Sequence, residues 1–477
     1  MSTSTTRPDS FQFREAFGPF LIDKELPFAS VLPASVIEQA FADEGVRFGT
    51  TSNSVFTPAL TLWAFLSQVI SPSKSCRAAV LRVCTLLLAL ERGPCSADTA
   101  AYCRARAKLP AIVLKRLALQ VGRELEEQAP QDWLWHGRHV SLVDGTTMTL
   151  PDTAENQAAF PQAPTQAPGV GFPIIRMVLL LSFATAAIRA MAYGRYSGKK
   201  TGETALLRPL LDQIPAGEVL VADRYYCSYW MVALALARGQ DVAFRMHQRR
   251  DFDFRRGQRL GHHDHLVVWH RPQRPEWMDE ETYATIPETL TVRELEYQIS
   301  EPGCRTEEVV IVTTMTDPEL YSKEDIADLY HQRWHAEIDI RAIKQSLGLE
   351  HLSCKTPEMV ERELWVHMLG YNLIRKVAAQ VASSHGMHPR EISFTATRQA
   401  LDASWMQWTT ATSVQRVRQG EQMLKTLSQA KVGDRPNRHE PRAVKRPKDK
   451  YDKLKEPRSE AKAKLQKRKP KKKKQAK

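Results

Sequence analysis

The residues best suited to chemistry lie in one short segment, YHQRWHAEIDIRAIK, which runs from Tyr330 to Lys344. If the segment is a helix, Tyr330, Arg333, Glu337 and Lys344 fall within a stripe about 60° wide, because each residue advances the helix by about 100°. A neighbouring apolar stripe predicts that the helix packs through that side and holds the polar row along its edge. A carboxylate in such a row can bind a divalent metal, while the cations and the phenol contact phosphate oxygens. Any one of these residues could equally belong to a solvated helix face, but the four together favour a phosphodiester site.

Metal-assisted phosphoryl transfer needs further acidic ligands, and two strand-like runs supply them. Residues 139–144 alternate and are rich in β-branched side chains up to Asp144, after which Gly145 permits a turn. Residues 218–223 form a short buried strand that ends at Asp223. Each aspartate alone is commonly a helix N-cap or a turn residue. Their order with Glu337 favours a shared site at the strand ends.

Three motifs in this order resemble those of the DDE transposases of the insertion-sequence-4 group, and the resemblance covers most of the chain. The motifs are D-G-T at 144–146, D-R-x-Y at 223–226 and Y-(2)-R-(3)-E-(6)-K at 330–344. The resemblance implies a ribonuclease-H-like catalytic core with a metal-binding catalytic triad of Asp144, Asp223 and Glu337. It implies DNA-phosphate contacts near the cleaved end from Tyr330, Arg333 and Lys344.

The same resemblance implies a DNA transposase that cuts at terminal inverted repeats and joins the 3′ ends to target DNA. Mg²⁺ would be the cofactor, with Mn²⁺ able to substitute, and the partners would be double-stranded DNA and a second copy of the chain in a homodimer. Two alternatives stay open: a repurposed ribonuclease-H-like nuclease, and a catalytically silent DNA-binding protein derived from a transposase. Loss of a triad member would indicate the silent protein, and none is lost.

One departure concerns the tryptophan that some family members carry on the strand before the signature helix, where it stacks on a flipped base. The corresponding run, 308–314, has none. Trp269 and Trp277 could substitute, although core or rim positions are the favoured interpretation.

Positive charge is concentrated at the C-terminus. The chain has a net charge of +13, yet residues 431–477 hold 21 Lys and Arg against 6 Asp and Glu, which leaves 46 against 48 in residues 1–430. A segment so rich in lysine and proline cannot bury enough apolar surface to fold, so we predict a disordered basic tail. Non-specific DNA attraction through counterion release is favoured over a purely solubilising role.

The remaining composition predicts a cytoplasmic protein, and the resemblance implies a bacterial one that associates with the nucleoid when it binds DNA. The seven cysteines are odd in number and contain no C-x-x-C pair, which is typical of reduced thiols. The N-terminal segment is polar, and the longest apolar stretch is interrupted by Arg176 and Arg189, so no signal peptide and no membrane span are predicted.

The predicted fold class is α/β, with a ribonuclease-H-like mixed sheet at its centre. Strands are expected at 139–144, 174–183, 186–194, 218–223 and 241–246, with helices at 202–214 and 229–238. The expected organisation is a helical N-terminal domain with possible DNA binding (1–130), a catalytic core (131–247 and 307–385), a β-rich insertion (248–306), a helical C-terminal region (386–430) and the tail (431–477).

Two further sets of residues are candidate binding sites. The third N-terminal helix, with Ser96 as its expected N-cap, carries Tyr102, Arg104, Arg106 and Lys108, which either enter a DNA groove or form an ordinary basic surface. The insertion carries His262, His263, Asp264, His265 and His270. A zinc site there is disfavoured, because no cysteine accompanies them and adjacent histidines rarely converge on one ion.

Overall fold

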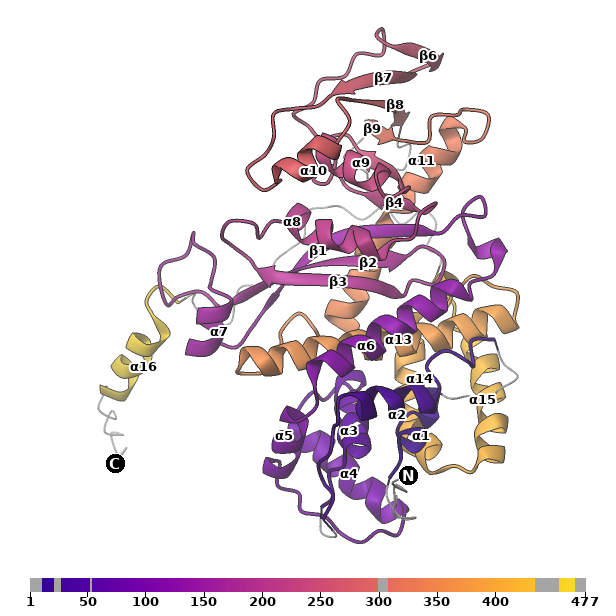
Figure 1. Ribbon diagram of the computed structural model, residues 1–477. Helices are drawn as coiled ribbons and strands as arrows, with labels where there is room; N and C mark the ends of the chain where they lie inside the picture. Colours follow the sequence, from indigo (N-terminus) through magenta and orange to yellow (C-terminus); the bar gives the residue numbers. More distant parts are fainter. Residues whose placement is uncertain (1–10, 21–26, 52–53, 299–307, 434–453, 468–477) are drawn as a thin grey trace, which may run out of the picture.

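A mixed β-sheet runs through the centre of the computed structural model, which describes residues 11–20, 27–51, 54–298, 308–433 and 454–467 (Figure 1). Among these residues the sheet has nine strands in the order β3-β2-β1-β4-β5-β9-β8-β7-β6. The strands are β1 (Val140–Thr149), β2 (Ile174–Ser182), β3 (Ile188–Arg195), β4 (Val219–Ala222), β5 (Asp241–Arg245), β6 (Gln258–Gly261), β7 (Asp264–His270), β8 (Thr289–Gln298) and β9 (Glu308–Thr313).

The strand order identifies the core as ribonuclease-H-like. Strands β1, β2 and β3 pair antiparallel as a meander, and β4 and β5 then add to β1 in parallel. β4 is buried throughout and β5 is buried in its three central residues, as expected for strands covered on two faces. The predicted fold class is therefore confirmed, and the expected strands lie within a few residues of their observed bounds.

The segment between β5 and β9 extends this sheet rather than forming a sheet of its own. β7 pairs antiparallel with β8, and β8 pairs with β9. One short helix, α10 (Glu280–Thr285), lies between β7 and β8. The segment thus has the strands that the sequence predicted, and its assignment as an insertion domain stays a prediction.

Helices from both ends of the chain pack together on one face of the sheet. From the N-terminal part come α1 (Phe13–Ala16), α2 (Ala34–Asp43), α3 (Pro58–Ile70), α4 (Cys76–Ala89), α5 (Ala100–Ala107) and α6 (Ala111–Glu127). From the C-terminal part come α13 (Pro357–Ser384), α14 (Phe394–Thr410) and α15 (Ser413–Ser428). Helix α13 packs along α6 and also contacts α3, α14 and α15, so that one hydrophobic core joins both sets (Figure 1).

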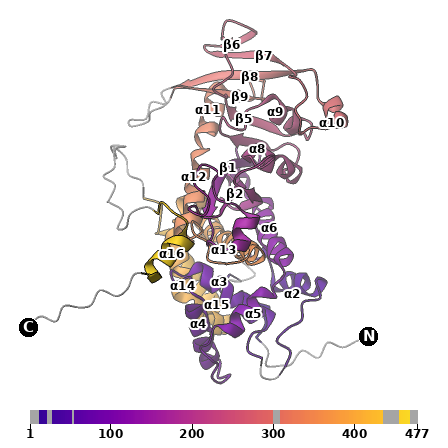
Figure 2. The ribbon, with the colours of Figure 1, turned by 90° about the vertical axis from the view of Figure 1, so that its left-hand side faces the viewer.

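The opposite face of the sheet has its own core, covered by α8 (Glu203–Leu207) and α9 (Tyr229–Leu236). In Figure 2 these helices lie on the other side of β1 and β2 from α11 (Lys323–His331) and α12 (Trp334–Arg341). Alternate residues of β1 divide between the two cores: Leu142 belongs to the first and Val143 to the second.

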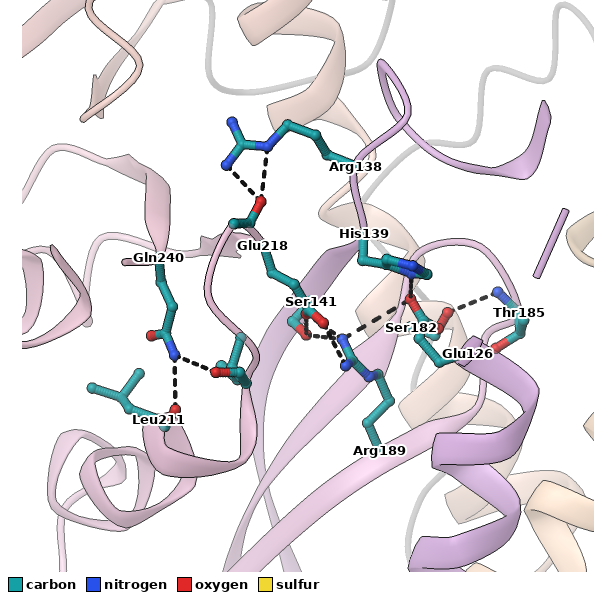
Figure 3. A network of polar contacts seen from close by, with 12 residues as sticks. Glu126, Arg138, His139, Ser141, Ser182, Thr185, Arg189, Leu211, Glu218 and Gln240 are labelled. Atoms are coloured by element: carbon teal, nitrogen blue, oxygen red, sulfur yellow. Dashed lines mark hydrogen bonds and ion pairs between the residues drawn. The ribbon is translucent and has the colours of Figure 1, made fainter. Parts of the chain in front are cut away.

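A buried polar network holds the beginnings of the central strands (Figure 3). Arg189 on β3 donates to the two carboxylate oxygens of Glu218 at 2.5 and 2.7 Å and to Ser141 at 2.9 Å. Nearby, the carboxylate of Glu126 at the end of α6 accepts from His139 at 2.8 Å, and this hydrogen bond raises the pKa of His139. Because Ser141 is in β1 and Glu218 immediately precedes β4, the network supports the register between these two strands.

Part of the predicted disordered tail is helical. Helix α16 (Arg458–Lys467) is anchored at its first residue, where Arg458 pairs with Asp152 at 3.1 Å and lies over the ring of Phe172. These contacts join α16 to the loops that flank α7, and disorder of the tail as a whole stays a prediction. The rest of the predicted tail, 434–453 and 468–477, lies outside the described residues. In the described part of the chain no helix is long and apolar enough to cross a membrane.

Candidate active site

Asp144 and Asp223 are brought side by side by the parallel pairing of β1 and β4. Leu142 is opposite Val221 in this ladder, so continuing the register by two residues places Asp144 beside Asp223. Asp223 directly follows β4, as predicted. The prediction that the chain turns at Gly145 is wrong, because β1 continues through it to Thr149 in partnership with β2. Asp144 therefore lies within a long strand, at the point where its pairing with β4 ends.

The signature segment is not the single straight helix that the spacing predicted. Helix α11 ends at His331, and α12 begins at Trp334. Between them Arg333 donates its backbone N–H to Tyr330 three residues earlier, which tightens the chain at the junction. After α12 the chain widens into a π-helical turn, η4 (Ala342–Ser346). The angles calculated for one regular helix therefore do not apply to Lys344.

Glu337 faces the two aspartates from α12, which packs against β1. Its carboxylate accepts a hydrogen bond from Arg333 at 2.8 Å. Burial raises the pKa of Asp144 to about 6. The negative charges of Glu337 and Asp223 contribute to this increase, and the N–H of Gly145 and the guanidinium of Arg333 oppose it. The three acids and Arg333 thus form one electrostatic unit.

The three remaining members of the predicted set differ in their environments. Tyr330 is buried, and this burial raises the pKa of its hydroxyl to about 12, so it is a neutral hydrogen-bonding group at pH 7. Arg333 is largely enclosed by the acids that it faces. Lys344 is half-buried and makes no side-chain hydrogen bond or ion pair with any residue that the structure describes. Its ammonium group is therefore available to a ligand.

The sequence model of the transposase DDE domain matches residues 135–373, which span β1 to α13 and include the three acids. The chain belongs to this family. The predicted membership in the insertion-sequence-4 group of DDE transposases is confirmed by a curated relative, transposase InsG for insertion sequence element IS4 from Escherichia coli (strain K12). The two sequences are 27% identical over 299 residues, which covers 62% of this chain and 64% of the relative. The match thus spans a little less than two thirds of the relative's length.

A solved structure with a similar chain path is the piggyBac transposase synaptic complex with hairpin DNA. The TM-score is 0.44 and the sequence identity 9%, with 90% of this chain and 87% of the other covered.

The chemistry of the donor set in this DDE family member fits a magnesium ion, because Asp144, Asp223 and Glu337 supply carboxylate oxygens and Mg²⁺ prefers oxygen ligands. Among the described residues, however, no three acidic, histidine or cysteine side chains are already arranged to hold a metal ion. The observed hydrogen bonds give a reason: Glu337 is engaged by Arg333, and one oxygen of Asp144 accepts the N–H of Gly145 at 2.8 Å.

The sequence did not predict a fourth acid, Glu203, which lies near the predicted triad. Glu203, the first residue of α8, places its carboxylate against Gly145 and accepts a hydrogen bond from Tyr226 at 3.2 Å. Its distance from the other acids in sequence concealed it. The signal that could have found it is Gly145 itself, a glycine inside a strand, which often marks a close approach of other atoms to the backbone.

Two members of the third-helix set have structural roles. Tyr102 is fully buried and bonds to Gln68, and the Arg106 guanidinium lies over the ring of Phe65, so neither is placed to enter a DNA groove. Arg104 and Lys108 are exposed, and DNA binding by this helix stays a prediction. That helix also starts later than expected, with Thr99 rather than Ser96 at its N-cap.

Three members of the histidine-rich stretch, His263, Asp264 and His265, form ion pairs with residues of β8, whereas His262 and His270 are exposed. His265 is buried against Glu294, and Asp264 pairs with Arg293 at 2.6 Å. Trp269 is likewise a core residue, with its indole N–H donated to Glu294 at 2.8 Å.

Proposed function

We propose that the protein is a DNA transposase that cuts DNA at the ends of an insertion sequence and joins the 3′ ends to a target. The observation that carries the proposal is the meeting of Asp144, Asp223 and Glu337 at one edge of a ribonuclease-H-like sheet, in a chain that belongs to the transposase DDE domain family. The similarity to a transposase of an insertion sequence element supports the same class of substrate.

In this proposal Asp144, Asp223 and Glu337 hold divalent metal ions, Mg²⁺ in the cell with Mn²⁺ as a substitute. Bound metal would activate a water or a 3′-hydroxyl and stabilise the leaving oxygen. Arg333 neutralises the acids while metal is absent, and it must share or release Glu337 when metal binds. Arg333, Lys344 and Tyr330 contact phosphate oxygens of the DNA end, the first two as charged donors and the third as a neutral hydroxyl.

A donor-plasmid assay tests this function. The reading frame and its flanking DNA are placed on a plasmid, and excision and reinsertion are followed in cells by junction sequencing. We expect joined ends bracketed by short direct duplications of the target. Cut ends that never join to a target would favour the nuclease interpretation, and a protein that binds the ends without cutting them would favour the silent one.

A further inference from the structure

Glu203 lies against Gly145 and close enough to Asp223 to feel its charge, on the other face of the sheet from Glu337. It begins α8, which packs against β2 and β3 on the side of the second hydrophobic core. The helix α12 that carries Glu337 packs on the side of the first core. Figure 2 shows α8 and α12 on opposite sides of β1. Glu337 on one face of the sheet and Glu203 on the other therefore lie on either side of the strands that carry Asp144 and Asp223.

Gly145 is the residue that gives Glu203 this position. A Cβ atom built on Gly145 would lie 2.6 Å from each carboxylate oxygen of Glu203, closer than real Cβ atoms come to such atoms. Gly145 has an ordinary strand conformation, with no positive φ to require a glycine. The space above its Cα is thus filled by the Glu203 carboxylate, next to Asp144 in the chain.

Tyr226 orients the same carboxylate from a second direction. It is buried, and its hydroxyl donates to Oε2 of Glu203 at 3.2 Å. Tyr226 follows Asp223 by three residues, so the turn after β4 carries both a predicted metal ligand and the residue that holds Glu203. Glu203 itself is half-buried, and so its carboxylate is accessible to a small ion.

We propose that Glu203 is a fourth carboxylate of the catalytic site, which binds a divalent metal ion from the α8 side, with Gly145 leaving room for it and Tyr226 positioning it. The inference rests on the proposed function, since it adds a ligand to the same site. It answers a chemical need: two hard cations prefer about six oxygen ligands each, and three carboxylates supply few of them. It also assigns a physical role to Gly145 of the D-G-T motif and to Tyr226 of the D-R-x-Y motif.

Binding of Mn²⁺ to the full-length protein tests the proposal without relying on activity. The free Mn²⁺ signal in electron paramagnetic resonance is followed during titration of wild type, Asp144→Asn, Glu203→Gln and, as a matched control, the exposed Glu281→Gln of α10. Glutamine keeps the shape of Glu203 and still accepts the Tyr226 hydroxyl, but it loses the charge. We expect Glu203→Gln and Asp144→Asn each to weaken Mn²⁺ binding about tenfold or more, and the control to bind as wild type does.

Two more variants separate metal binding from folding. Gly145→Ala should displace the Glu203 carboxylate and weaken Mn²⁺ binding as Glu203→Gln does, and Tyr226→Phe should have a smaller effect of the same sign. Thermal melts with and without Mn²⁺ provide the second readout: the gain in Tm that Mn²⁺ gives to wild type should shrink in these variants.

The outcomes distinguish this inference from the function on which it rests. Wild-type affinity in both Glu203→Gln and Gly145→Ala, with weakened binding in Asp144→Asn, would overturn the role of Glu203 and leave the triad intact. Absence of any Mn²⁺ binding by wild type would count against the proposed metal chemistry itself.

Discussion

Asp144 is held in an environment that opposes its own charge. Its burial and the neighbouring acids raise its pKa to about 6, although an ordinary aspartate has a value of 3.8. A raised pKa means that the folded protein keeps this proton to higher pH than the unfolded chain. Stability from this group is therefore present at low pH and falls as the pH rises from about 4 to about 6. A bound cation would relieve the repulsion among these acids, so the site favours a cation.

Replacement of Asp144 by asparagine should accordingly make the metal-free protein more stable. At pH 7.5 we expect the free energy of unfolding of Asp144→Asn to exceed that of wild type by about 1–3 kcal/mol, and the gap to close towards pH 4. Urea unfolding at the two pH values measures both quantities. Equal stability at pH 7.5 would show that the acids do not strain the fold.

The same pKa predicts the acid limit of activity at Mg²⁺ concentrations that do not saturate the site. Protonation of Asp144 competes with metal binding, so DNA cleavage in Mg²⁺ should decline as the pH falls through about 6. The rate of single-turnover cleavage between pH 5 and pH 8 tests this. At subsaturating Mg²⁺, a rate that declines only near pH 4 would mean that Asp144 titrates as an ordinary carboxylate.

Arg333 and Lys344 should contribute to DNA binding by different amounts. Replacement of Lys344 by alanine removes a cation that the described structure leaves unpaired, and we expect binding of the cleaved end to weaken by about 1.5–3 kcal/mol. Arg333→Ala also frees Glu337 and leaves the acids less neutralised, so metal affinity should rise while DNA affinity falls. The exposed Arg341→Ala on α12 is the control. Footprints of the terminal nucleotides that are unchanged in both variants would refute these contacts.

At the scale of the elements, strand register is what places the acids, and the buried network around Arg189 supports it. Glu218→Ala removes one partner of a buried bidentate pair and should lower the free energy of unfolding by about 3–5 kcal/mol. The control is Asp212→Ala, which removes an exposed ion pair with Arg238 at 2.7 Å and should cost less than about 1 kcal/mol. Similar destabilisation in the two variants would mean that the network does not support the sheet.

Most of these elements could be predicted because they are encoded locally. The buried β-branched runs indicated β1 and β4, and the expected helix at 229–238 corresponds to α9. The path of the signature segment could not be predicted, because the 3₁₀-like junction at Arg333 and the π-helical turn at Lys344 depend on packing against the sheet. Glu203 was missed for a related reason: only the packing of α8 against the sheet brings it to Gly145.

At the scale of the whole molecule, we predict that the basic C-terminus strengthens the binding of DNA by the near-neutral body. Deletion of the chain after Gly433 should lower the affinity for any duplex and flatten its salt dependence, because fewer counterions are released. The slope of log K against log salt should change by about 0.9 for each DNA phosphate that the shortened protein no longer neutralises. Cleavage at saturating DNA should survive, since Arg458 of α16 pairs with Asp152 and not with the catalytic acids. Equal slopes for the two proteins would favour a solubilising role for the tail.

The central claim is that three acids from separate elements form one metal-dependent catalytic site. Its most direct test is single-turnover cleavage of an insertion-sequence end in Mg²⁺ by wild type and by Asp144→Ala, Asp223→Ala and Glu337→Ala, with the affinity of each for the same DNA measured by gel shift. We predict that each variant binds the end nearly as wild type does and that none cuts it, because each lacks a metal ligand but keeps nearly all of its DNA-binding surface. A variant that cuts at a rate near that of wild type would contradict the assignment.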